Sequence, residues 1–221
     1  MPFPLTHILV AGLVGKALEV KDLGAFTLGS ISPDAVHHRK GLIGAAKSEI
    51  GPAKKITHLQ APKNGDWGAP KSLDVWTQDV LEFASQHKSD FAKGYATHIL
   101  TDIFNNTAAW VPFKTAYPEE YAKGYKSLYY TELAQIDLQL YHQLYKDSAL
   151  QAAFNGAKPQ GIAGYISEEE VRAIHHNIKN EAYNNAPNGN TENCRFITYS
   201  QAVDVMHGAA EFCLLNLKQV H

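Results

Sequence analysis

The segment from Ser89 to Asn106, SDFAKGYATHILTDIFNN, gives the clearest indication of the fold. Ser89 and Asp90 are residue types that favour the start of a helix, and the apolar residues after them recur at helical spacing. We therefore expect a helix from Phe91 to about Asn106. Helical periodicity also dominates the rest of the chain, which has no convincing alternation of apolar and polar residues. The sequence predicts an all-α fold.

Start and stop signals indicate further helices on both sides of this segment. They are expected over Leu5 to Val20, after Ser32-Pro33-Asp34, over Ser72 to His87 and Pro118 to Lys146, after Ser167-Glu168-Glu169-Glu170, and over Thr198 to Lys218. The expected connections are Gly24 to Ser32, the long loop Gly51 to Lys71, Asn155 to Gly164, and Asn184 to Asn193. Because no repeat or strong linker divides the chain, residues 1–221 are predicted to form a single-domain multi-helix bundle.

Composition narrows the choice of partners. The 20 basic and 22 acidic side chains give a net charge of −2, so nothing in the charge favours nucleic acid. The sequence shows no apolar stretch long enough for a transmembrane segment and no secretory signal, and we expect a cytoplasmic protein. The two cysteines are too few for a disulfide framework. The 11 histidines are roughly twice the usual number for this length, which directs attention to metals.

His98 and Asp102 are the most informative pair. They lie four residues apart in an otherwise apolar helix, so both side chains project from one face and can reach one ion. Gly94, on the same face, would let another backbone or an ion approach closely. A buried hydrogen-bonded pair and a plain surface pair are the alternatives to metal ligation.

Three other candidates are ordinary when taken singly. His7 lies on the apolar side of the first helix, where a histidine is commonly a hydrogen-bonded core residue. Asp34 could be an acid favoured by the dipole in the first turn of a helix. His58 falls in the expected loop and could simply be solvated.

Their order along the chain resembles the zinc-dependent phospholipase C family, an all-helical family related to the fungal single-strand nucleases. The resemblance rests on His7, Ser32-Pro33-Asp34, Thr57-His58 and His98-x-x-x-Asp102 and covers roughly the first half of the chain. Its most specific parts are GSISPD (29–34) and GYATHILTD (94–102). Enzymes of this family hold zinc ions between helices and hydrolyse phosphate esters.

The resemblance implies a role for each matching residue. His58 and His98 would bind a central zinc together with Asp34, and Asp102 would bridge to a second ion bound by His7. The predicted cofactor is thus one or two zinc ions, although mixed imidazole and carboxylate ligands also suit Fe, Mn or Ni. A departure from the family is that no histidine follows Asp102 within residues 103–108.

Two further positions are considered as ligands. Asp137 is bordered by apolar residues on a predicted helix, and burial of its charge would be offset by a metal, a basic partner or a hydrogen-bonded tyrosine. We count it among the candidate metal ligands. His207 and Glu211 are also four residues apart, but we expect them on the exposed side of the last helix.

The sequence therefore predicts a metal-dependent hydrolase of phosphate esters that uses a metal-activated water, with Asp34 helping to deprotonate or orient that water. A phospholipid, a nucleotide or another small phosphoester would be the substrate. Trp67, Trp76, Tyr95, Trp110 and Tyr130 are candidates for pocket walls or for packing. The alternative is a helical binding or regulatory protein with a structural or vestigial metal site.

Overall fold

The computed structural model describes residues 3–60 and 72–220, and these confirm the all-α fold. No β-strand occurs in these two ranges, which contain one isolated bridge between Ile162 and Ile166. The α-helices are α1 (Pro4–Ala17), α2 (Leu23–Gly29), α3 (Lys47–Thr57), α4 (Leu73–Gln86), α5 (Asp90–Asn105), α6 (Val111–Ala116), α7 (Pro118–Ala122), α8 (Leu128–Leu140), α9 (Ala149–Gly156), α10 (Glu168–Asn177) and α11 (Tyr199–Leu217). The 3-10 helices η1 (Ser32–His38) and η3 (Gly124–Lys126) and the π-helical turns η2 (Asn106–Trp110), η4 (Tyr141–Tyr145) and η5 (Ile178–Ala182) complete the set.

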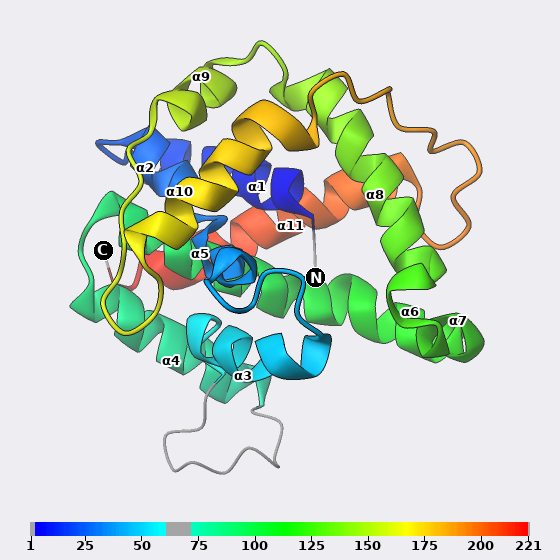
Figure 1. Cartoon of the computed structure of the whole chain (residues 1–221), viewed down its shortest axis with the longest axis horizontal. Coiled ribbons are helices and arrows are strands. Elements are labelled where there is room, and N and C mark those ends of the chain that lie inside the picture. The colour runs from blue at the N-terminus through cyan, green and yellow to red at the C-terminus, as the bar shows by residue number, and fades with distance from the viewer. Residues whose placement is uncertain (1–2, 61–71, 221) are drawn as a thin grey trace.

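Helix α5 forms the centre of the molecule, where α1, α2, α4 and α11 pack against it (Figure 1). Its N-terminus is capped as the sequence predicts, because the Ser89 hydroxyl accepts a hydrogen bond from the Ala92 amide at 3.2 Å. Most of its residues are buried, from Phe91 through Ile103. A helix covered by neighbours on several sides is apolar nearly all round, and this leaves its few polar side chains buried too.

Two glycines bring α2 unusually close to α5. A Cβ atom on Gly94 would lie 1.8 Å from the carbonyl oxygen of Phe26, and one on Gly29 would lie 2.0 Å from that of Phe91. Neither position can therefore carry a side chain without separating the two helices. This close contact places the end of α2 beside the N-terminal part of α5, at Phe91 and Tyr95.

The predicted connection from Gly24 to Ser32 is wrong, because most of it is helix α2. Asp22 caps this helix by accepting a hydrogen bond from the Ala25 amide at 2.9 Å. Ser32 does not act as an N-cap, since its hydroxyl donates back to the Leu28 carbonyl at 2.7 Å. The glycines that suggested a connection serve close helix packing instead.

The first part of the predicted loop Gly51–Lys71 is also helical, since α3 extends to Thr57, and residues 61–71 lie outside the described residues. The long helix predicted over Pro118–Lys146 is interrupted. Gly124 has φ of +58°, a left-handed conformation that ends α7 before α8 begins. The first helix ends at Ala17 and not at Val20.

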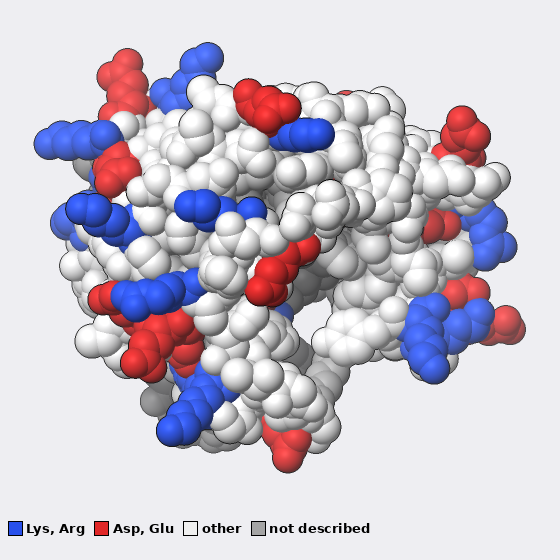
Figure 2. All heavy atoms as spheres, turned by 45° about the horizontal axis from the view of Figure 1, so that its top comes forward, with Lys and Arg blue, Asp and Glu red and all other residues white. Residues whose placement is uncertain are grey.

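Basic and acidic side chains are mixed over the visible surface, and a hollow opens between the parts formed by α3 and by α6 to α8 (Figure 2). In the part of the chain that the structure describes, every helix is too short or too polar to cross a lipid bilayer.

Candidate metal centre

Helix α5 and the C-terminal end of α3 bring His58, His98 and Asp102 together. The Nε2 atoms of His58 and His98 lie 3.3 Å apart. Oδ2 of Asp102 lies 3.7 Å from the first of these nitrogens and 3.8 Å from the second. All three side chains are buried, and their donor atoms lie within 4.8 Å of one another, a spacing that one metal ion could bridge.

His7 from α1 and Asp34 from η1 complete the cluster. Nε2 of His7 lies 3.6 Å from Oδ1 of Asp102, and the His7 ring stacks on His98 with a centroid distance of 3.8 Å. Oδ1 of Asp34 lies 3.4 Å from Nε2 of His58. Donor atoms of His7, Asp34 and His98 form a second group within 4.8 Å, which shares His98 with the first. The predicted residues from four separate stretches therefore meet at one place.

Backbone carbonyl groups set the orientation of two of the imidazoles. Nδ1 of His98 lies 2.7 Å from the carbonyl oxygen of Ser30, and Nδ1 of His58 lies 3.0 Å from that of Lys54. A carbonyl only accepts hydrogen bonds, so these contacts favour a proton on each Nδ1, which leaves each Nε2 with a lone pair. Metal-binding histidines commonly have this arrangement.

The cluster contains buried polar atoms with no hydrogen-bond partner among the described residues. These are both carboxylate oxygens of Asp102 and both ring nitrogens of His7. Burying such atoms unpaired is costly, and two lone pairs facing each other at 3.3 Å repel unless a proton or a cation lies between them. The residues present therefore fit one or two divalent cations.

Electrostatics favours the neutral imidazole at His7 and His98 and the charged carboxylate at Asp34. Burial, with a smaller contribution from His98, holds the pKa of His7 well below its usual value, and burial also lowers the pKa of His98. Burial alone would raise the pKa of Asp34, but Lys54 and His58 outweigh it, and this pKa lies well below the usual range. Neutral imidazole and ionised carboxylate are the forms that bind metals.

Lys54 belongs to the site although the sequence analysis did not identify it. Its Nζ donates to Oδ1 of Asp34 at 2.7 Å. Burial would lower the pKa of Lys54, but the carboxylates of Asp34 and Asp102 raise it overall, so the ammonium group stays charged. Lys54 precedes His58 by one helical turn, so both side chains lie on one face of α3. The loop expected over Gly51 to Lys71 gives no such relation between the two residues.

A cavity of about 750 Å³ opens onto the cluster and is lined by Asp34, Lys54, His58 and Asp102. Three of the aromatic candidates also line it, namely Trp76, Trp110 and Tyr130. Tyr95 is buried packing whose hydroxyl donates to the Thr57 carbonyl, and Trp67 lies outside the described residues.

Asp137 does not join the donor groups that the structure brings together. Its Oδ1 accepts a hydrogen bond from the Leu5 amide at 3.1 Å, and its Oδ2 accepts one from the Tyr183 hydroxyl. Of the alternatives left open by the sequence, the hydrogen-bonded tyrosine is therefore the one observed. His207 and Glu211 are exposed, as expected, and are likewise outside these groups.

In comparisons with known proteins, no family model, curated protein or solved structure matches the chain.

Proposed function

We propose that the protein is a metal-dependent hydrolase of phosphate esters. His7, Asp34, His58, His98 and Asp102 would hold zinc or a similar divalent ion. The observation that carries the proposal is a set of buried atoms on His7 and Asp102 that have no hydrogen-bond partner among the described residues. They belong to a cluster that opens onto a cavity large enough for a small phosphoester. The substrate would be a lipid or small-molecule phosphoester, and we expect the protein to act in the cytoplasm.

The residues of the chain divide the chemistry between them. When bound, divalent ions supply an activated water and neutralise the charge that develops at phosphorus. The Ser30 and Lys54 carbonyls hold the His98 and His58 rings in one orientation, which keeps the ligand geometry fixed. The Asp34 side chain is 26% exposed and lines the cavity, so its carboxylate can accept a hydrogen bond from the attacking water and orient it.

Metal analysis combined with a turnover assay tests the proposal. The purified protein should contain one or two zinc or similar ions per chain and should release p-nitrophenolate from p-nitrophenyl phosphate or its bis ester. His98→Ala should lose both the ions and the turnover, whereas His176→Ala should lose neither, because His176 is exposed and outside the cluster. A metal-free preparation with full activity would contradict the proposal.

The deep burial of the ligands favours one second candidate, a helical binding or regulatory protein with a structural metal site. His7, His58, His98 and Asp102 are each at most 4% exposed, as is typical of closed structural sites. This candidate predicts bound metal and a melting temperature that falls on chelation, with no turnover above that of the free ion.

A further inference from the structure

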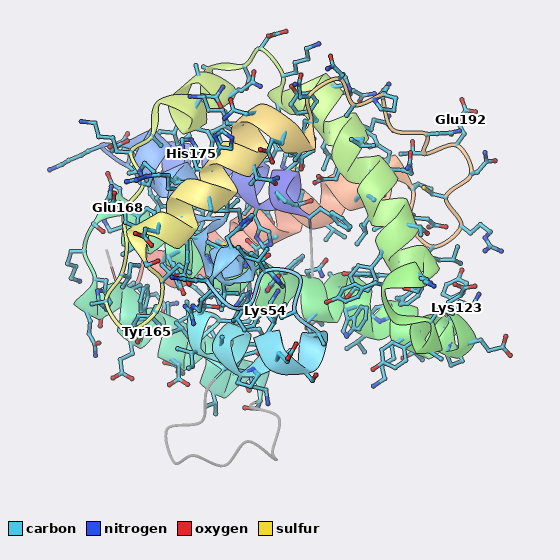
Figure 3. All side chains as sticks on the ribbon, viewed as in Figure 1. Lys54, Lys123, Tyr165, Glu168, His175 and Glu192 are labelled. Atoms are coloured by element: carbon cyan, nitrogen blue, oxygen red, sulfur yellow. The ribbon has the colours of Figure 1, made fainter. Side chains whose placement is uncertain are left out.

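Lys54 places a positive charge inside the candidate metal centre. Its side chain is 24% exposed and lies on α3, facing the middle of the molecule (Figure 3). Lys123 offers a contrast, because it forms a similar pair with Glu120 at 2.6 Å but is 54% exposed at the outer edge beside α7 (Figure 3). The two lysines thus form similar ion pairs, and only Lys54 lines the cavity of the metal centre.

The Lys54 ammonium group has hydrogen-bonding capacity left for a ligand. An ammonium group has three N–H donors, and among the described residues the hydrogen-bond partner of Nζ is the Asp34 carboxylate alone. Its remaining donors are next to the same cavity that reaches Asp102 and His58. A group with several acceptor oxygens that binds at the ions would also reach Lys54.

The balance of charge indicates which ligand this is. Lys54 compensates Asp34, so Asp102 is the one remaining carboxylate in the donor groups to oppose a bound divalent ion. The two positive charges of a single divalent ion already exceed the one negative charge of Asp102, and a second ion would increase this excess. Such a centre attracts a dianion more strongly than a monoanion.

From this geometry we propose that Lys54 binds the non-bridging oxygens of the substrate phosphate and makes the centre selective for phosphomonoesters over phosphodiesters. A monoester carries close to two negative charges near neutral pH, whereas a diester carries one. The inference rests on the proposed function, because it specifies the substrate class of the same centre.

Binding of inorganic phosphate tests Lys54 without turnover. Calorimetric titration of the zinc-loaded protein at pH 8 should show phosphate binding that Lys54→Met weakens at least about tenfold, because a charged hydrogen bond is lost. Lys54→Arg keeps the charge and should stay within about threefold of the wild type. Lys123→Met is the matched control and should bind as the wild type does. Equal phosphate affinity of wild type and Lys54→Met would overturn the inference.

Zinc content separates phosphate binding from an indirect effect. Lys54→Met should retain the zinc of the wild type, because the Lys54 carbonyl that orients His58 is unchanged. If Lys54→Met loses zinc while its far-ultraviolet circular dichroism is unchanged, Lys54 acts by holding Asp34, and the inference is overturned.

Kinetics with two esters tests the selectivity. The wild type should hydrolyse p-nitrophenyl phosphate with a kcat/KM at least about tenfold above that for bis(p-nitrophenyl) phosphate, and Lys54→Met should reduce this ratio about tenfold. Equal or greater activity on the diester overturns the selectivity and leaves the proposed function standing. A zinc-loaded protein that hydrolyses neither ester overturns the proposed function and the selectivity together.

Discussion

Helices α5 and α8 both bury carboxylates, but they differ in whether these carboxylates accept hydrogen bonds from described residues. On α8, Glu132 accepts hydrogen bonds from the Arg195 and Phe196 amides at 2.7 and 2.8 Å, and Asp137 is bonded to Leu5 and Tyr183. On α5, both oxygens of Asp102 lack a hydrogen-bond partner among the described residues. All three carboxylates are at most 6% exposed.

The contrast separates structural carboxylates from candidate ligands. Burying a carboxylate is unfavourable in each case, and neighbouring donors reduce that cost on α8. On α5 no described residue donates to Asp102, and imidazole nitrogens of His7, His58 and His98 lie 3.6 to 3.8 Å from its oxygens. A buried acid therefore indicates a metal site when its oxygens are unpaired, and burial alone does not.

The largest expected effect follows from Asp102→Asn. The variant should lose most of its bound metal and at least about 100-fold in turnover, because a negatively charged candidate ligand is lost. In chelator, however, it should be about 1–2 kcal/mol more stable than the wild type, because a neutral amide is less costly to bury than an unpaired carboxylate. Metal analysis and urea unfolding measure the two effects. Asp204→Asn, on the exposed side of α11, is the control. If Asp102→Asn retained its metal, Asp102 would not differ from the structural carboxylates of α8.

Asp137 should show its effect through pH. Burial raises its pKa to about 7, so between pH 5 and 7 the folded protein keeps a proton that the unfolded chain has lost. The wild type therefore loses stability as pH rises through this range, whereas Asp137→Asn does not. From pH 5 to pH 8, urea unfolding should show Asp137→Asn gaining about 2–3 kcal/mol relative to the wild type. Changes in stability that come from metal binding are common to both proteins and cancel in the comparison. A difference in unfolding free energy between the two proteins that stays constant from pH 5 to pH 8 would contradict the prediction.

Glu132→Gln should give the smallest effect, a loss of about 2 kcal/mol that lowers the melting temperature by roughly 4–8 °C. The amide keeps one acceptor oxygen and places an N–H group against a backbone donor. Zinc content should not change, since Glu132 is outside the donor groups. Glu169→Gln is the control because Glu169 is exposed, and thermal unfolding with metal analysis measures both. Loss of zinc from Glu132→Gln would mean that α8 and the centre are not independent.

The sequence predicts those parts of the fold that local signals determine. Ser89 caps α5 as expected, and the start signal Ser167-Glu168-Glu169-Glu170 does the same for α10. Helix α2 was missed because Gly24 and Gly29 are typical of connections. The role of Gly29 in helix contact depends on α5, which is far away in sequence.

The candidate centre was predicted in its residues but not in its arrangement. Spacing relates only His98 and Asp102, which share one helix, and the resemblance of motifs added His7, Asp34 and His58. Asp137 was ambiguous because its partner Tyr183 lies 46 residues away and no pattern links them. Lys54 could be related to His58 only through the helical register of α3, and a loop is expected there from the sequence.

The close approach of α2 and α5, at Gly29 against Phe91 and at Gly94 against Phe26, means that the centre is held by backbone against backbone. The carbonyl of Ser30, one residue after the first glycine, orients His98, four residues after the second. Neither glycine belongs to the donor groups, yet both set where the ligands stand. Grafting this centre onto another scaffold would therefore require the α2–α5 pair as one rigid unit, and copying the five ligand side chains alone would not reproduce it.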